Sequence, residues 1–93
     1  MHNDSRIELY DGLRTTTNNA LELADRFLGI EYRMDSPGRY ISEDNLRVVR
    51  IGDNDILGKH GDGRQMNFET LGPNPQKPGK MTVIKNLHIY LTD

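Results

Sequence analysis

Two histidines and one glutamate in the second half of the chain could together perform general acid–base chemistry. His60 lies in the loop-like stretch DNDILGKHGDGRQ, and His88 lies in the C-terminal run KMTVIKNLHIYLTD. Glu69 belongs to MNFETL, a short alternating run between them that predicts a strand. A carboxylate and an imidazole that share one surface suit paired proton transfer, in which one group takes a proton while the other gives one.

Side-chain alternation places the polar residues of the two strands on one surface. Met66 and Phe68 share one side of MNFETL, so the residues between them point to the opposite side. In the C-terminal run, the side with Met81, Val83, Leu87, Ile89 and Leu91 is apolar apart from Lys85. If both apolar sides pack under a helix, the surface left over carries Asn67, Glu69, Asn86, His88 and Tyr90.

Basic residues near these strands indicate a phosphate-containing substrate. They are Arg47, Arg50, Lys59, Arg64, Lys80 and Lys85. A guanidinium binds a phosphate in two places and stabilises the charge that develops on phosphorus. Cleavage of RNA without a metal needs a base for the ribose 2′-OH, an acid for the leaving oxygen and cations for the phosphate, because the ribose supplies the nucleophile. We therefore expect an endoribonuclease without a cofactor.

The expected roles divide the candidate residues into two groups. The catalytic residues are expected to be His60, His88, Glu69, Arg47 and Arg50. The residues expected to bind substrate are Asn67, Lys80, Asn86, Tyr90 and Arg64.

Two other kinds of function remain open at this point. Asp53, Asp55, His60 and Asp62 could hold a metal in a DNase, although their spacing lacks the alternating acids and closing glutamate of a hard-cation loop. The glycines nearby fit neither a Walker nor a dinucleotide pattern. A binding or immunity module without catalytic activity is the third possibility, and its faint support is the net charge of −2.

Composition predicts one domain over residues 1–93 that does not interact with a membrane. The 93 residues leave no room for a second core, and no apolar run approaches the length of a membrane span. The absence of cysteine excludes disulfides, thiolate metal sites and thiol catalysis. Residues 1–46 carry five arginines against nine acids, whereas residues 47–93 carry seven basic residues against five acids. The more basic half is the one with the candidate site.

The pattern of apolar residues predicts an α+β domain in which an N-terminal helix packs on a small, about four-stranded antiparallel sheet. Residues 18–28 show helical spacing, with Asn19 and Glu22 as a capping box and Gly29 as the C-terminal cap. GRYISEDNLRVVRIG predicts two strands joined by a turn, in which Val48-Val49 indicates a bulge or a strand covered on both faces. Residues 1–17 lack firm periodicity and are expected to be loosely ordered.

The C-terminal part of the chain, about residues 38–93, resembles toxin modules at the ends of Rhs-repeat and contact-dependent inhibition proteins. The resemblance consists of a strand with two arginines, a loop of the form D-x-D-I/L-x-G-x-H-G, an N/H-F-E strand, GK, and a terminal NLHI-L. The matching positions are Arg47, Arg50, Asp55, His60, Asn67, Glu69, Lys80, Asn86 and His88. Asn67 stands where some relatives have a further histidine, and the acidic net charge also departs from that group.

The resemblance implies a polymorphic toxin domain that is part of a larger secreted or surface-delivered protein and acts in the cytoplasm of a competitor cell. Many similar modules are metal-independent ribonucleases of the barnase/colicin/RelE-like fold, which cut tRNA or rRNA. They are blocked by a cognate immunity protein, and the free domain is expected to be a monomer.

Overall fold

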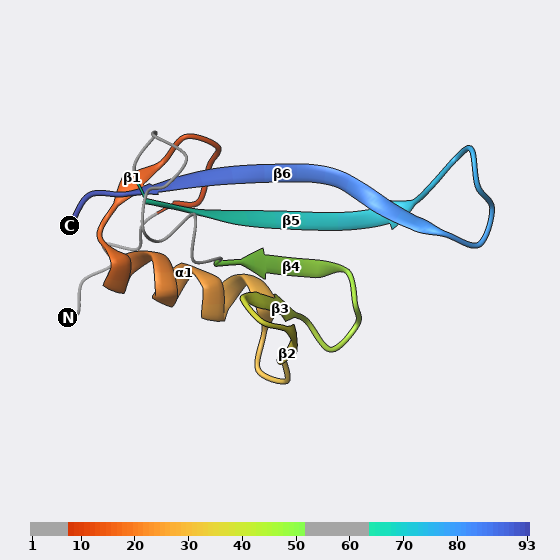
Figure 1. The fold of residues 1–93 in the computed structure, drawn as a ribbon, viewed down its shortest axis with the longest axis horizontal. Helices are drawn as coiled ribbons and strands as arrows, with labels where there is room; N and C mark the ends of the chain where they lie inside the picture. The colour runs from red at the N-terminus through yellow and green to blue at the C-terminus, as the bar shows by residue number, and fades with distance from the viewer. Residues whose placement is uncertain (1–7, 52–63) are drawn as a thin grey trace.

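One helix packs on one face of a six-stranded sheet in the computed structural model, which describes residues 8–51 and 64–93 (Figure 1). The helix is α1 (Thr17–Leu28), and the strands are β1 (Arg14–Thr15), β2 (Arg33–Ser36), β3 (Arg39–Ile41), β4 (Arg47–Arg50), β5 (Gln65–Pro73) and β6 (Met81–Leu91). Their order in the sheet is β1-β6-β5-β4-β3-β2. The α+β class is confirmed. The expectation of about four antiparallel strands is wrong, because β1 and β2 add to the sheet and β1 runs parallel to β6.

Helix α1 begins and ends at residues with specific capping geometry. The side chain of Thr16 accepts a hydrogen bond from the backbone N–H of Asn19 at 3.2 Å, so Thr16 is the N-cap and the expected capping box at Asn19 is wrong. Gly29 has φ 87° and donates its N–H to the carbonyl of Asp25, as expected of the C-terminal cap. The buried face of the helix consists of Ala20, Leu23, Ala24 and Leu28.

The core lies between this helical face and the sheet. Met66, Phe68 and Ile89 are fully buried there, and the ring of Phe27 packs edge-on against Phe68 with centroids 5.3 Å apart. Val48 and Val49 are both fully buried, and β4 pairs with β3 and β5 without a register shift. Both faces of β4 are therefore covered, which settles the two interpretations of the Val48-Val49 pair. Full burial of one such apolar side chain contributes about 1.5–3 kcal/mol.

The segment before α1 is bound to the outer edge of β6. Gly12 donates its N–H to the carbonyl of His88, and Tyr90 donates its N–H to the carbonyl of Leu13, both at 2.8 Å. Leu13 is buried in the core. The expectation of loose order at residues 1–17 is therefore wrong from residue 12 onward, because backbone hydrogen bonds and an apolar anchor hold this stretch.

Strands β5 and β6 extend beyond the rest of the sheet as a two-stranded arm (residues 71–85; Figure 1). A register shift between Thr70 and Leu71 marks its base, and β4 pairs with β5 only as far as Thr70. Met81 and Val83 are about half exposed here. The expectation that they share the core face with Ile89 is wrong, because the arm leaves the area that α1 covers.

Candidate functional site

The sheet face opposite α1 carries the polar side chains that alternation predicts for it. We call it the polar face, and it comprises Arg50, Asn67, Glu69, Asn86, His88 and Tyr90. Pairing across three strands forms a row from Arg50 through Asn67 to His88. The next row places Asn86 opposite Glu69. Glu69 and His88 are thus diagonal neighbours on adjacent strands and on the same face.

The imidazole of His88 is held by a residue that the sequence did not suggest. The carboxylate of Asp11 accepts the backbone N–H of His88 at 2.8 Å and lies 3.1 Å from the ring nitrogen Nδ1. These two hydrogen bonds, first the one from the backbone and then the one from the ring, hold the pKa of Asp11 below its ordinary value. A carboxylate bound to Nδ1 fixes the orientation of the ring and leaves Nε2 as the nitrogen for proton transfer.

Arg50 and Glu69 form an ion pair beside this histidine. Arg50 Nη1 lies 3.7 Å from Glu69 Oε2, and the side chain of Arg50 is 55% exposed whereas that of Glu69 is 7% exposed. A buried carboxylate needs a cation or hydrogen-bond donors nearby. Glu69 is therefore placed to orient Arg50, whose outer edge stays open to an anion.

Two amide oxygens on the polar face are buried without a hydrogen-bond partner among the described residues. They are the Oδ1 atoms of Asn67 and Asn86. Asn67 lies directly opposite His88, and Asn86 lies directly opposite Glu69. Unsatisfied buried acceptors are uncommon in folded proteins and are found where a ligand or a water completes the network.

Arg47 does not belong to the polar face. It points to the helix side of β4, where its guanidinium lies 5.4 Å from the ring centroid of Phe27 and donates a hydrogen bond to the Phe27 carbonyl at 3.1 Å. Residues three apart in a strand point to opposite faces, so Arg47 and Arg50 cannot grip one phosphate together. Arg47 therefore lies on the other side of the sheet from His88, Glu69 and Arg50.

Two of the residues expected to bind substrate, Arg64 and Lys80, lie away from the centre of the polar face, whereas a third, Tyr90, lies on it. Arg64 donates hydrogen bonds to the Asp93 carbonyl and to the Thr17 hydroxyl, and so links the C-terminus to the start of α1. Lys80 lies at the tip of the arm, eight residues from His88 along the chain, or roughly 25 Å along an extended strand. Tyr90 lies on the polar face, where the guanidinium of Arg14 sits 6.0 Å from its ring centroid. Neither Arg64 nor Lys80 therefore lies beside His88.

Several candidate residues predicted from the sequence lie outside the part of the chain that the structure describes. They are His60 and the possible metal ligands Asp53, Asp55 and Asp62. Within residues 8–51 and 64–93, no three histidines or carboxylates come close enough to hold a metal ion. Helix α1, among these same residues, lacks the length and the apolar composition of a membrane-spanning helix.

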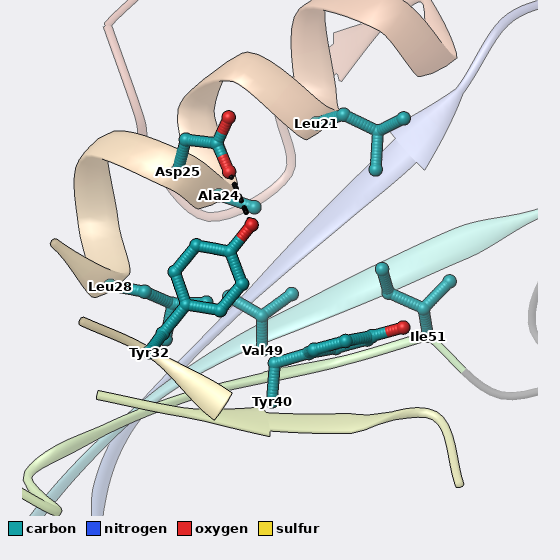
Figure 2. A pocket seen from close by; sticks show the side chains of 8 residues that line it. All are labelled: Leu21, Ala24, Asp25, Leu28, Tyr32, Tyr40, Val49 and Ile51. Carbon is teal, nitrogen blue, oxygen red and sulfur yellow. Dashed lines mark hydrogen bonds between the residues drawn. The ribbon is translucent and has the colours of Figure 1, made fainter. Parts of the chain in front are cut away.

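A separate pocket of about 320 Å³ lies on the helix side of the sheet (Figure 2). It is lined by Leu21, Ala24, Asp25, Leu28, Tyr32, Tyr40, Val49 and Ile51. The Tyr32 hydroxyl donates to the Asp25 carboxylate at 3.0 Å, and this hydrogen bond raises the pKa of Tyr32. The sheet separates this pocket from His88, and its single charged side chain is an acid, which repels phosphate. The polar face is therefore the better candidate site.

Comparisons with protein-family models, with curated proteins and with solved structures each return no match for this chain.

Proposed function

We propose that this chain is a metal-independent endoribonuclease toxin domain in which His88 transfers protons at the polar face. The observation that carries the proposal is the Asp11–His88 hydrogen bond beside the Arg50–Glu69 ion pair. An oriented imidazole next to an exposed guanidinium provides two of the functions that metal-free RNA cleavage requires. The toxin context rests on the resemblance of residues 38–93 to Rhs-repeat and contact-dependent inhibition modules.

The proposed site lies over Asn67, between Arg50 and His88. Neighbouring strands are about 4.8 Å apart, so the Cα atoms of Arg50 and His88 are separated by roughly 10 Å across β5. That span suits one phosphodiester contacted by the guanidinium from one side and by Nε2 from the other. The amide of Asn67 lies beneath it and offers hydrogen bonds to the ribose or phosphate.

In the proposed reaction a base takes the proton of the ribose 2′-OH, and this oxygen forms a bond to phosphorus. The bond from phosphorus to the 5′-oxygen breaks, and an acid protonates that oxygen. The products are a 2′,3′-cyclic phosphate and a free 5′-OH. His88 performs one of these proton transfers, and the Arg50 guanidinium stabilises the charge on the phosphate. Glu69, which is buried, positions Arg50, and His60 remains the candidate from sequence for the second proton transfer.

Cleavage of labelled RNA by the full chain in EDTA tests the proposal. His88→Ala should abolish cleavage, whereas Arg47→Lys, on the opposite face of the same strand as Arg50, should retain it. Arg50→Lys should lower activity because lysine cannot grip a phosphate in two places. RNA that stays intact with the unmodified chain, or full cleavage by His88→Ala with unchanged folding, would remove the proposal.

The toxin role needs a separate experiment in cells. Induced expression in a bacterium should stop growth, and co-expression of the neighbouring downstream gene should restore it. A discrete tRNA or rRNA fragment should accumulate during the arrest. Harmless expression together with replaceable histidines would instead favour the binding or immunity module.

A further inference from the structure

Among the residues that the structure describes, no strand pairs with the outer edge of β6 along the arm. At its C-terminal end this edge is covered, because β1 pairs with Tyr90 and Leu91, and residues 11 and 12 hydrogen-bond to the backbone of His88. Residues 81–87 have no strand beside them on that side among residues 8–51 and 64–93. Seven residues of extended chain are about 23 Å long. An unpaired edge of this length is a template for pairing with another chain.

The arm combines positive charge with exposed apolar side chains. Residues 71–85 contain Lys77, Lys80 and Lys85 and no acid, in a chain whose net charge is −2. Met81, Val83 and Ile84 are 49%, 46% and 60% exposed. Met81 and Val83 share one face of the strand, and Ile84 lies on the other face, against Gly72. Exposed apolar side chains with charged residues around them are typical of a protein-binding surface.

The two edges of the arm differ in their ability to pair. The β5 edge ends in Pro73, and Pro75 follows shortly after it, so this side lacks donors. The β6 edge contains no proline between Met81 and Leu91. Ile84 also lies over the bare backbone of Gly72, where an added Cβ would be 2.7 Å from Ile84 Cδ1. The absence of a side chain at Gly72 therefore makes room for Ile84 against the β5 backbone.

We infer that residues 81–87 of β6 accept an added β-strand from a partner protein, an extended segment in which acidic and apolar residues alternate. Backbone hydrogen bonds along the open edge supply affinity, and side-chain contacts supply specificity. The acids of the segment meet the lysines of the arm, and its apolar residues cover Met81 and Val83, which share one face of the strand. This inference does not depend on the proposed ribonuclease activity.

Two other occupants fit the surface less well. A second copy of this chain would bring three lysines against three lysines, so pairing of two arms meets like-charge repulsion. A nucleic acid would use the lysines but would leave the open backbone edge and the exposed apolar side chains without partners. The protein strand is the occupant that uses all three features.

The test uses the full chain and three synthetic eight-residue peptides. One alternates valine with glutamate, the second has lysine in place of glutamate, and the third repeats the first with N-methylated amides along one edge. The acidic peptide should bind, and the other two should bind at least about tenfold more weakly, because they lose charge pairing or backbone donors. Backbone amide chemical shifts should change at residues 81–87 and stay constant around α1.

Two matched substitutions identify the surface. Val83→Thr should weaken binding of the acidic peptide, whereas Ile30→Thr should leave it unchanged, since Ile30 is 93% exposed but follows the end of α1. Equal binding of all three peptides, or shift changes confined to residues outside 71–87, would overturn the inference. So would a uridine oligonucleotide that shifts residues 81–87 when no peptide does, or concentration-dependent dimerisation through the arm in sedimentation.

Discussion

Replacement of Arg50 by methionine should lower the free energy of unfolding because it removes the ion pair with Glu69, and for no other reason. The two charges are 3.7 Å apart, and at an effective dielectric constant of about 20 their attraction is about 4.5 kcal/mol before solvent screening. Because the Arg50 side chain is 55% exposed, solvent screens most of this attraction, and we expect a loss of about 1–2 kcal/mol. Methionine keeps the apolar stem, so little packing is lost.

A double-mutant cycle with Glu69→Gln isolates the pair. Arg50→Met and Glu69→Gln should show a coupling energy of about 1 kcal/mol in urea unfolding, followed by circular dichroism because the chain has no tryptophan. Arg47→Met is the matched control on the same strand. It loses its contact with Phe27, yet its effect should add to that of Glu69→Gln within about 0.5 kcal/mol. Additive effects for Arg50 and Glu69, or coupling for Arg47, would refute the assignment of the two arginines to opposite faces.

Three other substitutions test the supporting contacts. Asp11→Asn should lower the kcat of RNA cleavage at least about tenfold with little change in KM, because the ring of His88 loses its orienting carboxylate. The Asp93 carboxylate accepts two hydrogen bonds from Thr17 that lower its pKa, so this contribution to stability is present above the ordinary value of about 4 and is lost as pH falls through the lowered pKa. The difference in urea midpoint between the unmodified chain and Asp93→Asn should therefore be constant near pH 7 and should shrink near pH 3. Thr16→Ala should lower the free energy of unfolding in urea by about 1 kcal/mol, because the N-cap hydrogen bond is lost. Asn18→Ala, two residues further along, should lower it much less.

Local periodicity was sufficient for α1 and for the faces of β5 and β6 on the C-terminal side of the β6 register shift. The apolar residues of α1 recur at helical spacing, and alternation correctly placed Glu69 and His88 on one side of the sheet. The same alternation places Arg47 and Arg50 on opposite faces of the sheet, because they are three residues apart in one strand. The role predicted for Arg47 relied on its positive charge and did not consider which face of the strand its position implies.

Strands β1 and β2 could not be predicted in this way. β1 has two residues, and such a short run has no period. All four residues of β2 are exposed, so no buried face produces an alternating pattern. Their existence depends on neighbours that are distant in sequence. The base of the arm could not be predicted from alternation either, because a register shift between Thr70 and Leu71 changes which side chains face the core.

The partner of His88 lay beyond the reach of local patterns for the same reason. Asp11 is 77 residues away in sequence, in a segment without periodicity, and reaches His88 because that segment covers the end of the β6 edge. The segment that covers this end of the β6 edge therefore also supplies the carboxylate that orients His88 in the proposed site. The other end of the same strand has no described cover, and there the unpaired backbone is free to bind another protein. The two proposed functions of β6 thus follow from how far residues 11–15 extend along its edge.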